Sequence, residues 1–437
     1  MIGHASYELE RYAEAEVAYV TVLETLPGAD ERRDDLVDNL AASIYQQAET
    51  ANANNDFRAA ADHFLRVSKM APTSTIRPNA EFDAATALIQ LEDWTAAAIV
   101  LTGFRQTFPT HALQPEVTKK IAYVYRQDGR LVQAAHEYER IETETEDEEI
   151  RREALLTAAE LYEEAGDDAL TLMVYQRYVA YFTEPIELNI ETRHKISLLL
   201  KASNDIEGYH QELEKIVVID ATAGAKRTDR TRYLASRSAL VLAERTYARF
   251  VAVRLVDPLE TNLRHKQTLM KEATQQFNQL LDYEVAEVTA ASTFYLAEVY
   301  AHFSTALMES ERPDNLNPLE MEQYELAIEE QAYPFEEKAI IVHESNLELI
   351  SLGIFNDWIE KSLQKLAEVM PARYDRPEVD SPVMMSLESY TYEIESQGTD
   401  DWPASEDSEP ADLVTAADQS LAGEGRDDAA NQQYEED

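Results

Sequence analysis

Residues 121–141 read IAYVYRQDGRLVQAAHEYERI and predict a helix, a tight turn and a second helix. Ile121 and Tyr125 are one helical turn apart, so a branched side chain lies beside an aromatic ring on one face of the first helix. Ala134 and Tyr138 repeat this spacing in the second helix. The glycine of the RQDGR turn permits the backbone conformation that ends a helix. The stretch therefore predicts a hairpin of two packed α-helices.

The same hairpin can be read both upstream and downstream of this stretch. Matching positions at the start of the second helix are spaced by 37 residues, at Phe57, Trp94, Leu131 and Asp168. Prolines, which cannot continue a helix, follow several second helices, at Pro27, Pro72, Pro109 and Pro185. The chain therefore predicts a row of similar hairpins.

This pattern of small and aromatic positions resembles the tetratricopeptide repeat (TPR), which has a period of about 34 residues. The resemblance implies an all-α fold, a TPR-type α-α superhelix or solenoid. It also implies that the first helix of each hairpin lines a concave groove in which segments of partner proteins bind.

A second resemblance covers most of residues 40–378. Residues 60–94 (AADHFLRVSKMAPTSTIRPNAEFDAATALIQLEDW), 309–350 and 356–378 are similar to large bacterial TPR proteins of the cell envelope. That family is associated with energy-transducing systems of the Ton or Tol type. The resemblance implies a periplasmic or cell-envelope scaffold with protein partners, and Ton/Tol-type components are the candidates for them.

Composition supports a helical fold and excludes several classes of function. Hydrophobic residues make up 45% of the 437 positions, and 11 glycines and 15 prolines are few enough to favour helices. The net charge of −46, from 84 acidic and 38 basic residues, disfavours nucleic acid as a partner. The chain has no cysteine, so it forms no disulfide and no thiolate zinc site. No stretch is apolar and long enough to span a membrane.

The sequence shows no recognisable chemistry of catalysis or of cofactor binding. None of the nine histidines has another at the spacing of a helical metal site, and no phosphate-binding glycine loop occurs. Carboxylates are so frequent that no pair stands out as an acid and a base. We therefore expect no catalytic, cofactor or metal site, no small-molecule ligand and no enzymatic activity.

Changes of pattern along the chain predict four regions. Residues 1–185 form the TPR array, 186–227 a degenerate hairpin and hinge, and 228–374 a block of longer helices. Within that block, we expect the Tyr-Pro-Phe triplet at 333–335 to end a helix. Residues 375–437 contain 19 acidic and 2 basic residues, and we predict an acidic, disordered tail.

The first residues match the end of a first helix and the whole of a second one. Ile2, Gly3 and Tyr7 fit the former, and Tyr12, Ala15 and Tyr19 the latter. Natural arrays end in polar capping helices, so we expect further repeats before Met1, from a truncated N-terminus. The alternative is a frayed first helix that the array tolerates.

Helical spacing predicts which side chains line the groove. Three first helices contribute five positions each: Asn79, Phe82, Thr86, Ile89 and Gln90; Glu116, Lys119, Tyr123, Arg126 and Gln127; and Glu153, Leu156, Glu160, Glu163 and Glu164. The last set is acidic, so a peptide with basic residues suits it by charge. The alternative is a face that only contacts solvent.

Two charged clusters have more than one interpretation. Lys226, Arg227, Arg230 and Arg232 form a basic island that either binds an anionic partner or pairs with nearby carboxylates. The run ETETEDEE at 142–149 either attracts calcium or serves as a solvated linker between repeats, and it lacks the spacing of a calcium loop.

Two functions follow from these observations. The first is a non-catalytic scaffold of a bacterial envelope complex that holds partner segments in the groove. The alternative is a cytoplasmic TPR adaptor or co-chaperone that binds a peptide tail.

Overall fold

The computed structural model describes residues 1–375, which contain α-helices, two short 3-10 helices and no strand. The predicted acidic tail lies outside these residues except for Asp375. The helices of the first part are α1 (Ile2–Glu8), α2 (Tyr12–Thr25), α3 (Arg33–Ala53), α4 (Phe57–Met70), α5 (Arg77–Gln90), α6 (Trp94–Thr107), α7 (Gln114–Gln127), α8 (Leu131–Glu144), α9 (Glu148–Glu164) and α10 (Asp168–Tyr181). Those of the second part are α11 (Ile186–Ala202), α12 (Ile206–Thr222), η1 (Gly224–Lys226), α13 (Asp229–Ala252), α14 (Leu259–Leu281), α15 (Ala286–Met308), α16 (Pro318–Glu348), η2 (Leu349–Leu352), α17 (Asp357–Val369) and α18 (Pro371–Tyr374).

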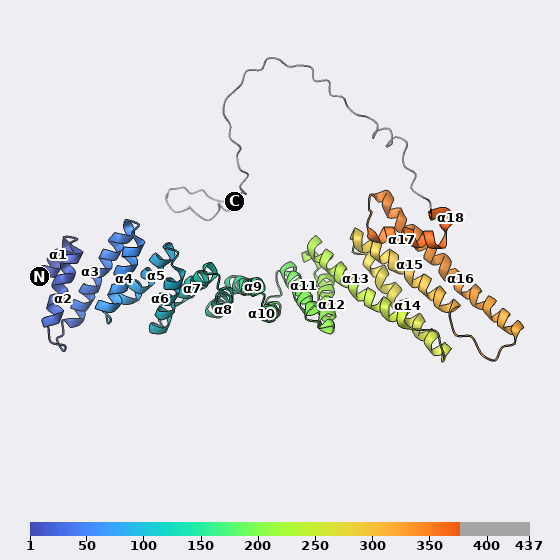
Figure 1. Cartoon of the computed structure of the whole chain (residues 1–437), viewed down its shortest axis with the longest axis horizontal. Helices are drawn as coiled ribbons and strands as arrows, with labels where there is room; N and C mark the ends of the chain where they lie inside the picture. Colours follow the sequence, from blue (N-terminus) through green and yellow to red (C-terminus); the bar gives the residue numbers. More distant parts are fainter. Residues whose placement is uncertain (376–437) are drawn as a thin grey trace, which may run out of the picture. The chain divides into compact units, whose positions relative to one another are not determined.

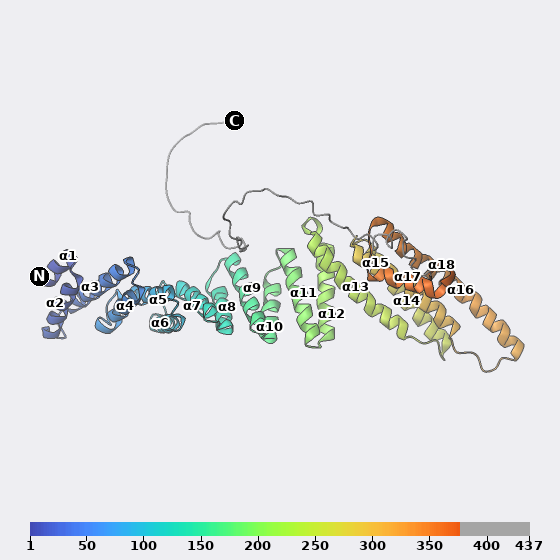
Figure 2. The same ribbon diagram turned by 45° about the horizontal axis from the view of Figure 1, so that its top comes forward.

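Each helix packs against the next one in the chain, from α1 to α18 (Figures 1 and 2). Odd-numbered helices up to α15 are the first helices of hairpins, and even-numbered helices up to α16 are the second. First helices also contact first helices of the next hairpin, as in the pairs α3 with α5 and α11 with α13. The fold class predicted from the sequence, an all-α TPR-type solenoid, is confirmed.

One kind of turn joins the two helices in most of the hairpins. The turn residue has a positive φ at Asn55, Glu92, Gly129, Gly166 and Asn204, which are 37 or 38 residues apart. The N–H of the residue after it donates to a carbonyl five residues earlier, for example from Asp93 to Leu88 at 3.0 Å. This bond satisfies a carbonyl that the end of the first helix leaves free. The turn therefore repeats with the period of the sequence.

Aspartate at the next position starts the second helix. Its carboxylate accepts a hydrogen bond from the backbone N–H three residues later in α4, α6, α10 and α12. Such a cap stabilises a helix by about 1 kcal/mol. Arg130 occupies the position before α8 and provides no such bond.

Small residues of one helix and large residues of its neighbour form the core. Ala84, Ala85 and Ala97 are fully buried, and so are aromatic residues such as Phe64 and Phe104. An alanine lets two helix axes approach, and the ring fills the space beside it. The core continues along the chain as successive clusters from α2 to α17.

The helical stacking does not stop where the sequence pattern changes. The described residues, 1–375, belong to one compact unit, in which α12 packs on α13, and α13 on α15. The helices from α13 to α16 are longer, with 24, 23, 23 and 31 residues. The boundaries at 185 and 227 therefore stay predictions, while contacts between neighbouring helices run across both.

The expected helix end at 333–335 is wrong. The helix α16 continues through Pro334 from Pro318 to Glu348. Pro334 lies on the exposed side, whereas Ala332 and Phe335 face α15, where the Phe335 ring lies 4.7 Å from that of Phe303. The hydroxyl of Ser304 also donates to the Ala332 carbonyl at 3.0 Å. Packing along the opposite face offsets the backbone hydrogen bond that a proline removes.

Candidate partner-binding surface

The fifteen residues predicted to line a groove lie on the first helices α5, α7 and α9. Four of them are half-buried: Phe82, Thr86, Ile89 and Leu156. The other eleven are exposed: Asn79, Gln90, Glu116, Lys119, Tyr123, Arg126, Gln127, Glu153, Glu160, Glu163 and Glu164. We call these fifteen residues the first-helix surface.

The half-buried members belong partly to the core. Phe82 and Ile89 pack against the cluster of buried residues that runs from α2 to α7, and Leu156 against the next cluster. The Thr86 hydroxyl donates to the Phe82 carbonyl at 3.0 Å within its own helix. Of the five residues on α5, only the exposed polar side chains of Asn79 and Gln90 are therefore available to a partner.

The helix α7 presents a mixed surface. Lys119 and Glu116 form an exposed ion pair at 2.8 Å, which a partner can exchange at little cost. Tyr123 is 44% exposed, and its ring contacts that of Trp94 edge-on with 6.0 Å between centroids. A partly exposed aromatic ring of this kind suits contact with an apolar side chain of a partner.

The helix α9 presents a row of carboxylates. Glu153, Glu160 and Glu164 follow at intervals of seven and four residues, so they share one side of the helix. Among residues 1–375 none of the three forms an ion pair. Three uncompensated negative charges therefore face solvent within a helix of 17 residues.

Glu163 differs from these three because it is already bonded. It accepts a hydrogen bond from the Tyr175 hydroxyl of α10 at 2.8 Å, and Lys195 of α11 lies 3.4 Å from it. Burial raises the pKa of Tyr175 to about 12, with the hydrogen bond to Glu163 adding to the effect. Glu163 therefore joins three helices, and its carboxylate is less available to a partner.

Sequence reasoning missed a polar group that joins the first helices of three successive hairpins. The Tyr45 hydroxyl of α3 donates to Asp83 of α5 at 2.5 Å. The Lys120 ammonium of α7 lies 4.9 Å from the centre of the Phe82 ring, next to Asp83 along α5. Tyr45 and Asp83 are 38 residues apart and Asp83 and Lys120 are 37, one repeat in each case. This spacing of one repeat is the sequence signal that could have indicated the group.

The environment of this group shifts its pKa values. Burial raises the pKa of the Asp83 carboxyl, although the Tyr45 hydrogen bond and Lys120 oppose the shift. Burial also lowers the pKa of the Lys120 ammonium, against the attraction of Asp83 and Glu116. Both charged forms are thus less stable than in water, and each depends on the other. The group fixes how successive first helices lie against one another.

The basic island pairs with carboxylates, as one of the two interpretations predicted. Lys226 lies 2.5 Å from Glu184, and Arg230 lies 2.7 Å from Glu191. Arg227 pairs at 2.8 Å with Asp220, which is fully buried, and Arg232 pairs with its neighbour Asp229 at 2.8 Å. The contacts of Lys226, Arg227 and Arg230 attach the segment before α13 and the first turn of α13 to the residues before α11, to α12 and to α11, whereas the Arg232 pair lies within α13.

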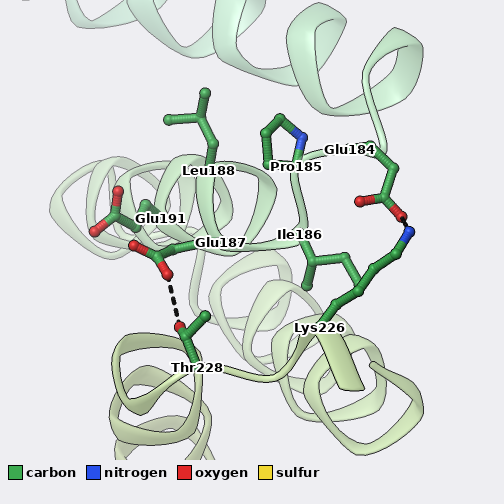
Figure 3. Close-up of a pocket in the computed structure, with 8 residues that line it drawn as sticks. All are labelled: Glu184, Pro185, Ile186, Glu187, Leu188, Glu191, Lys226 and Thr228. Atoms are coloured by element: carbon green, nitrogen blue, oxygen red, sulfur yellow. Dashed lines mark hydrogen bonds and ion pairs between the residues drawn. The ribbon is translucent and has the colours of Figure 1, made fainter. Parts of the chain in front are cut away.

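A depression of about 470 Å³ lies beside this island (Figure 3). The Lys226 ammonium and the Thr228 hydroxyl bond across it to Glu184 and Glu187, the latter at 2.6 Å. Its lining comprises Glu184, Pro185, Ile186, Glu187, Leu188, Glu191, Lys226 and Thr228. The charged groups there are largely paired with one another, so the depression offers little to an ionic ligand.

The acidic run at 142–149 is not a simple linker. Glu142 is buried in α8, and one of its oxygens accepts a hydrogen bond from Arg151 of α9 at 2.7 Å. Asp147 caps α9 through the N–H groups of Glu149 and Ile150. The rest of the run, residues 143–149, is exposed except for Thr145, which is half-buried. Nowhere in residues 1–375 do three or more His, Asp or Glu side chains gather as metal ligands would.

One buried group combines serine, histidine and glutamate. The Ser362 hydroxyl of α17 lies 3.2 Å from His343 Nδ1 of α16, and His343 Nε2 lies 3.4 Å from Glu298 of α15. Ser362 is fully buried and also accepts a hydrogen bond from Asn346 at 2.8 Å. A substrate in solvent does not reach this hydroxyl, so the group serves to join three helices.

The arrangement defines a class of protein: an array of TPR-like helical hairpins whose first helices carry an exposed polar surface. No known family model matches the chain, and no curated protein matches it.

Several solved structures of helical-repeat proteins are similar to parts of the chain. A tetratricopeptide repeat protein from Parabacteroides merdae is 10% identical, with a TM-score of 0.28, over 74% of this chain and 97% of that one. A chain of the Naa15/Naa10 complex bound to HypK-THB is 15% identical, with a TM-score of 0.30, over 84% of this chain and 63% of that one. The TPR domain of P58(IPK) is 14% identical, with a TM-score of 0.21, over 86% and 98%. These TM-scores are low, so the fold assignment rests on the helix order and packing described above.

Proposed function

We propose that this chain is a non-catalytic scaffold that binds segments of partner proteins along the first-helix surface. The observation that carries the proposal is the row formed by Glu153, Glu160 and Glu164, three exposed carboxylates without an ion pair in the described part of the chain. Such a row attracts lysine and arginine side chains, and Tyr123 on the preceding first helix offers an apolar contact. The preferred ligand is therefore a segment with several basic residues and one or two apolar ones.

A displayed peptide library tests the ligand class. We expect peptides selected on the full chain to be rich in lysine and arginine. A variant with Glu153→Lys, Glu160→Lys and Glu164→Lys should bind these peptides at least about tenfold more weakly, since each lost charge contact contributes about 0.5 kcal/mol or more. Glu163 is kept because its replacement would disturb the contact with Tyr175.

The control changes the net charge equally but elsewhere. Glu24, Asp62 and Glu214 are exposed on the second helices α2, α4 and α12, and their replacement by lysine also reverses three charges. We expect this control to bind the selected peptides nearly as well as the native chain. Equal weakening by both triple variants would show a general effect of charge, and selected peptides without basic residues would contradict the proposal.

We further propose that the scaffold belongs to a complex of the bacterial cell envelope, with Ton/Tol-type components among the candidates for partners. The support is the sequence resemblance of residues 40–378 to envelope TPR proteins. None of the helices in residues 1–375 is both apolar enough and long enough to cross a bilayer. A periplasmic reporter fused to the full-length gene product should be active. An inactive reporter would favour the cytoplasmic adaptor.

A further inference from the structure

The second helix α16 has two apolar faces, of which only one is covered. Its inner face includes Ala332, Phe335 and Ala339 and packs on α15. Leu319, Leu326 and Tyr333 follow one another at intervals of seven residues, and they are 64%, 60% and 61% exposed. At 100° per residue they project from the side opposite the inner face. We call these three residues the outer stripe.

The spacing of the outer stripe is that of helix pairing. Seven residues correspond to two turns, so the three side chains are about 10 Å apart along the helix axis. Apolar residues repeated every seven positions meet a partner helix that has the same repeat. An exposed apolar row of this kind marks an interaction surface.

The charge around the outer stripe specifies the partner. Residues 318–348 contain nine glutamates and one lysine. Glu330 and Glu337 lie on the same side as the outer stripe and Glu322 lies at its border, and none of these three forms an ion pair among residues 1–375. Lys338 lies over the Tyr300 ring at 4.2 Å, away from them. The acidic border repels a second copy of this chain, whose net charge is −46.

We propose that the outer stripe of α16 binds a basic amphipathic helix of another protein. Leucine or other apolar residues of that helix, spaced by three and four positions, would cover Leu319, Leu326 and Tyr333. Lysine or arginine residues on either side would pair with Glu322, Glu330 and Glu337. This is a helix-on-helix contact, separate from the first-helix surface in both its position and its mode of recognition.

The test uses a designed helical peptide of about four heptads, with leucine at the a and d positions and lysine at e and g. Its affinity for the full chain is measured by fluorescence anisotropy. We expect Leu326→Ser with Tyr333→Ser to weaken binding about tenfold or more, because two apolar contacts are lost. The control is Leu198→Ser with Tyr181→Ser, which removes a leucine and a tyrosine of similar exposure, 51% and 61%, from α11 and α10. It should leave the affinity unchanged.

Further outcomes decide the proposal. A counterpart peptide with glutamate in place of lysine should not bind. In the background Glu153→Lys, Glu160→Lys and Glu164→Lys, which removes the acidic row of the first-helix surface, Leu326→Ser with Tyr333→Ser should weaken binding of the basic peptide by the same factor as in the native chain. No binding of the basic peptide, or equal weakening by the control pair, would overturn the proposal. Sedimentation velocity tests whether a second copy of this chain occupies the outer stripe instead. A dimer of the native chain that dissociates on Leu326→Ser with Tyr333→Ser would show this and overturn the proposal.

Discussion

Replacement of Glu92 by glycine should stabilise the chain. Glu92 is the turn residue between α5 and α6 and has φ = +56°, which is unfavourable for a residue with a Cβ atom. Gly129 has the same place one repeat later, with φ = +71°. The left-handed conformation costs about 1–2 kcal/mol for a residue other than glycine, and the greater freedom of glycine in the unfolded chain cancels about 0.5–1 kcal/mol of this. The net gain expected for Glu92→Gly is about 0.5–1 kcal/mol.

The reciprocal change isolates the same quantity. A Cβ added at Gly129 meets no atom within 4 Å, so Gly129→Ala introduces no clash, and its expected loss of about 0.5–1 kcal/mol is conformational. Trp94 lies two residues after Glu92 and contacts Tyr123, so its fluorescence reports the unfolding of this hairpin. The assay is urea unfolding in a background in which the other two tryptophans, Trp358 and Trp402, are phenylalanine.

Glu214→Gly is the matched control, since Glu214 is exposed in the interior of α12. There the same substitution should destabilise by about 0.5–1 kcal/mol, the ordinary cost of glycine in a helix. The reasoning would be refuted by a Glu92→Gly variant less stable than the native chain, or by a neutral Gly129→Ala.

Three further predictions concern the helix cap of α8 and two buried cations. Arg130→Asp should supply the missing cap of α8 and raise the free energy of unfolding by about 0.5 kcal/mol. The cap contributes about 1 kcal/mol, and the lost guanidinium contact with Tyr125 removes about half of it. The midpoint of urea unfolding measures this gain. Arg105→Ala leaves the Glu137 carboxylate poorly solvated and without its two hydrogen bonds of 2.8 and 2.5 Å, so it should lower the free energy of unfolding by about 2–3 kcal/mol. In the same urea measurement the exposed control Lys119→Ala should lower it by less than about 0.5 kcal/mol. Burial lowers the pKa of Lys266 from 10.5 to about 8, so the unfolded chain binds more protons between these pH values, and stability rises with pH there. Between pH 7 and 9.5 the free energy of unfolding of the native chain should rise by about 2 kcal/mol relative to that of Lys266→Met. A difference between the two free energies that stays constant over this pH range would contradict the lowered pKa.

Much of the fold could be predicted because its determinants are local and repeated. The alternation of alanine with aromatic residues, and the glycines at 129 and 166, are visible in the sequence and correspond to packed pairs and left-handed turns. The turn at Glu92 gives no such local signal, and only the period of 37 residues identifies it. Pro334 misled the interpretation because packing on α15 outweighs a local preference.

The candidate surface was less predictable, because it depends on contacts between hairpins. Helical spacing gave the side of α9 that carries the exposed row Glu153, Glu160 and Glu164. Spacing does not reveal that Glu163 is bonded to Tyr175, nor that Tyr45 and Asp83 meet across two hairpins. Each of these contacts joins residues of different helices, and a single sequence does not specify how closely those helices approach.

The central claim is that nested hairpins leave the first helices exposed for recognition. The most direct measurement is a structure of the full chain with a selected basic peptide. The account predicts a peptide that contacts α7 and α9, with its basic residues at Glu153, Glu160 and Glu164. A peptide bound to the second helices α6, α8 and α10, or helices that do not stack in chain order, would contradict it.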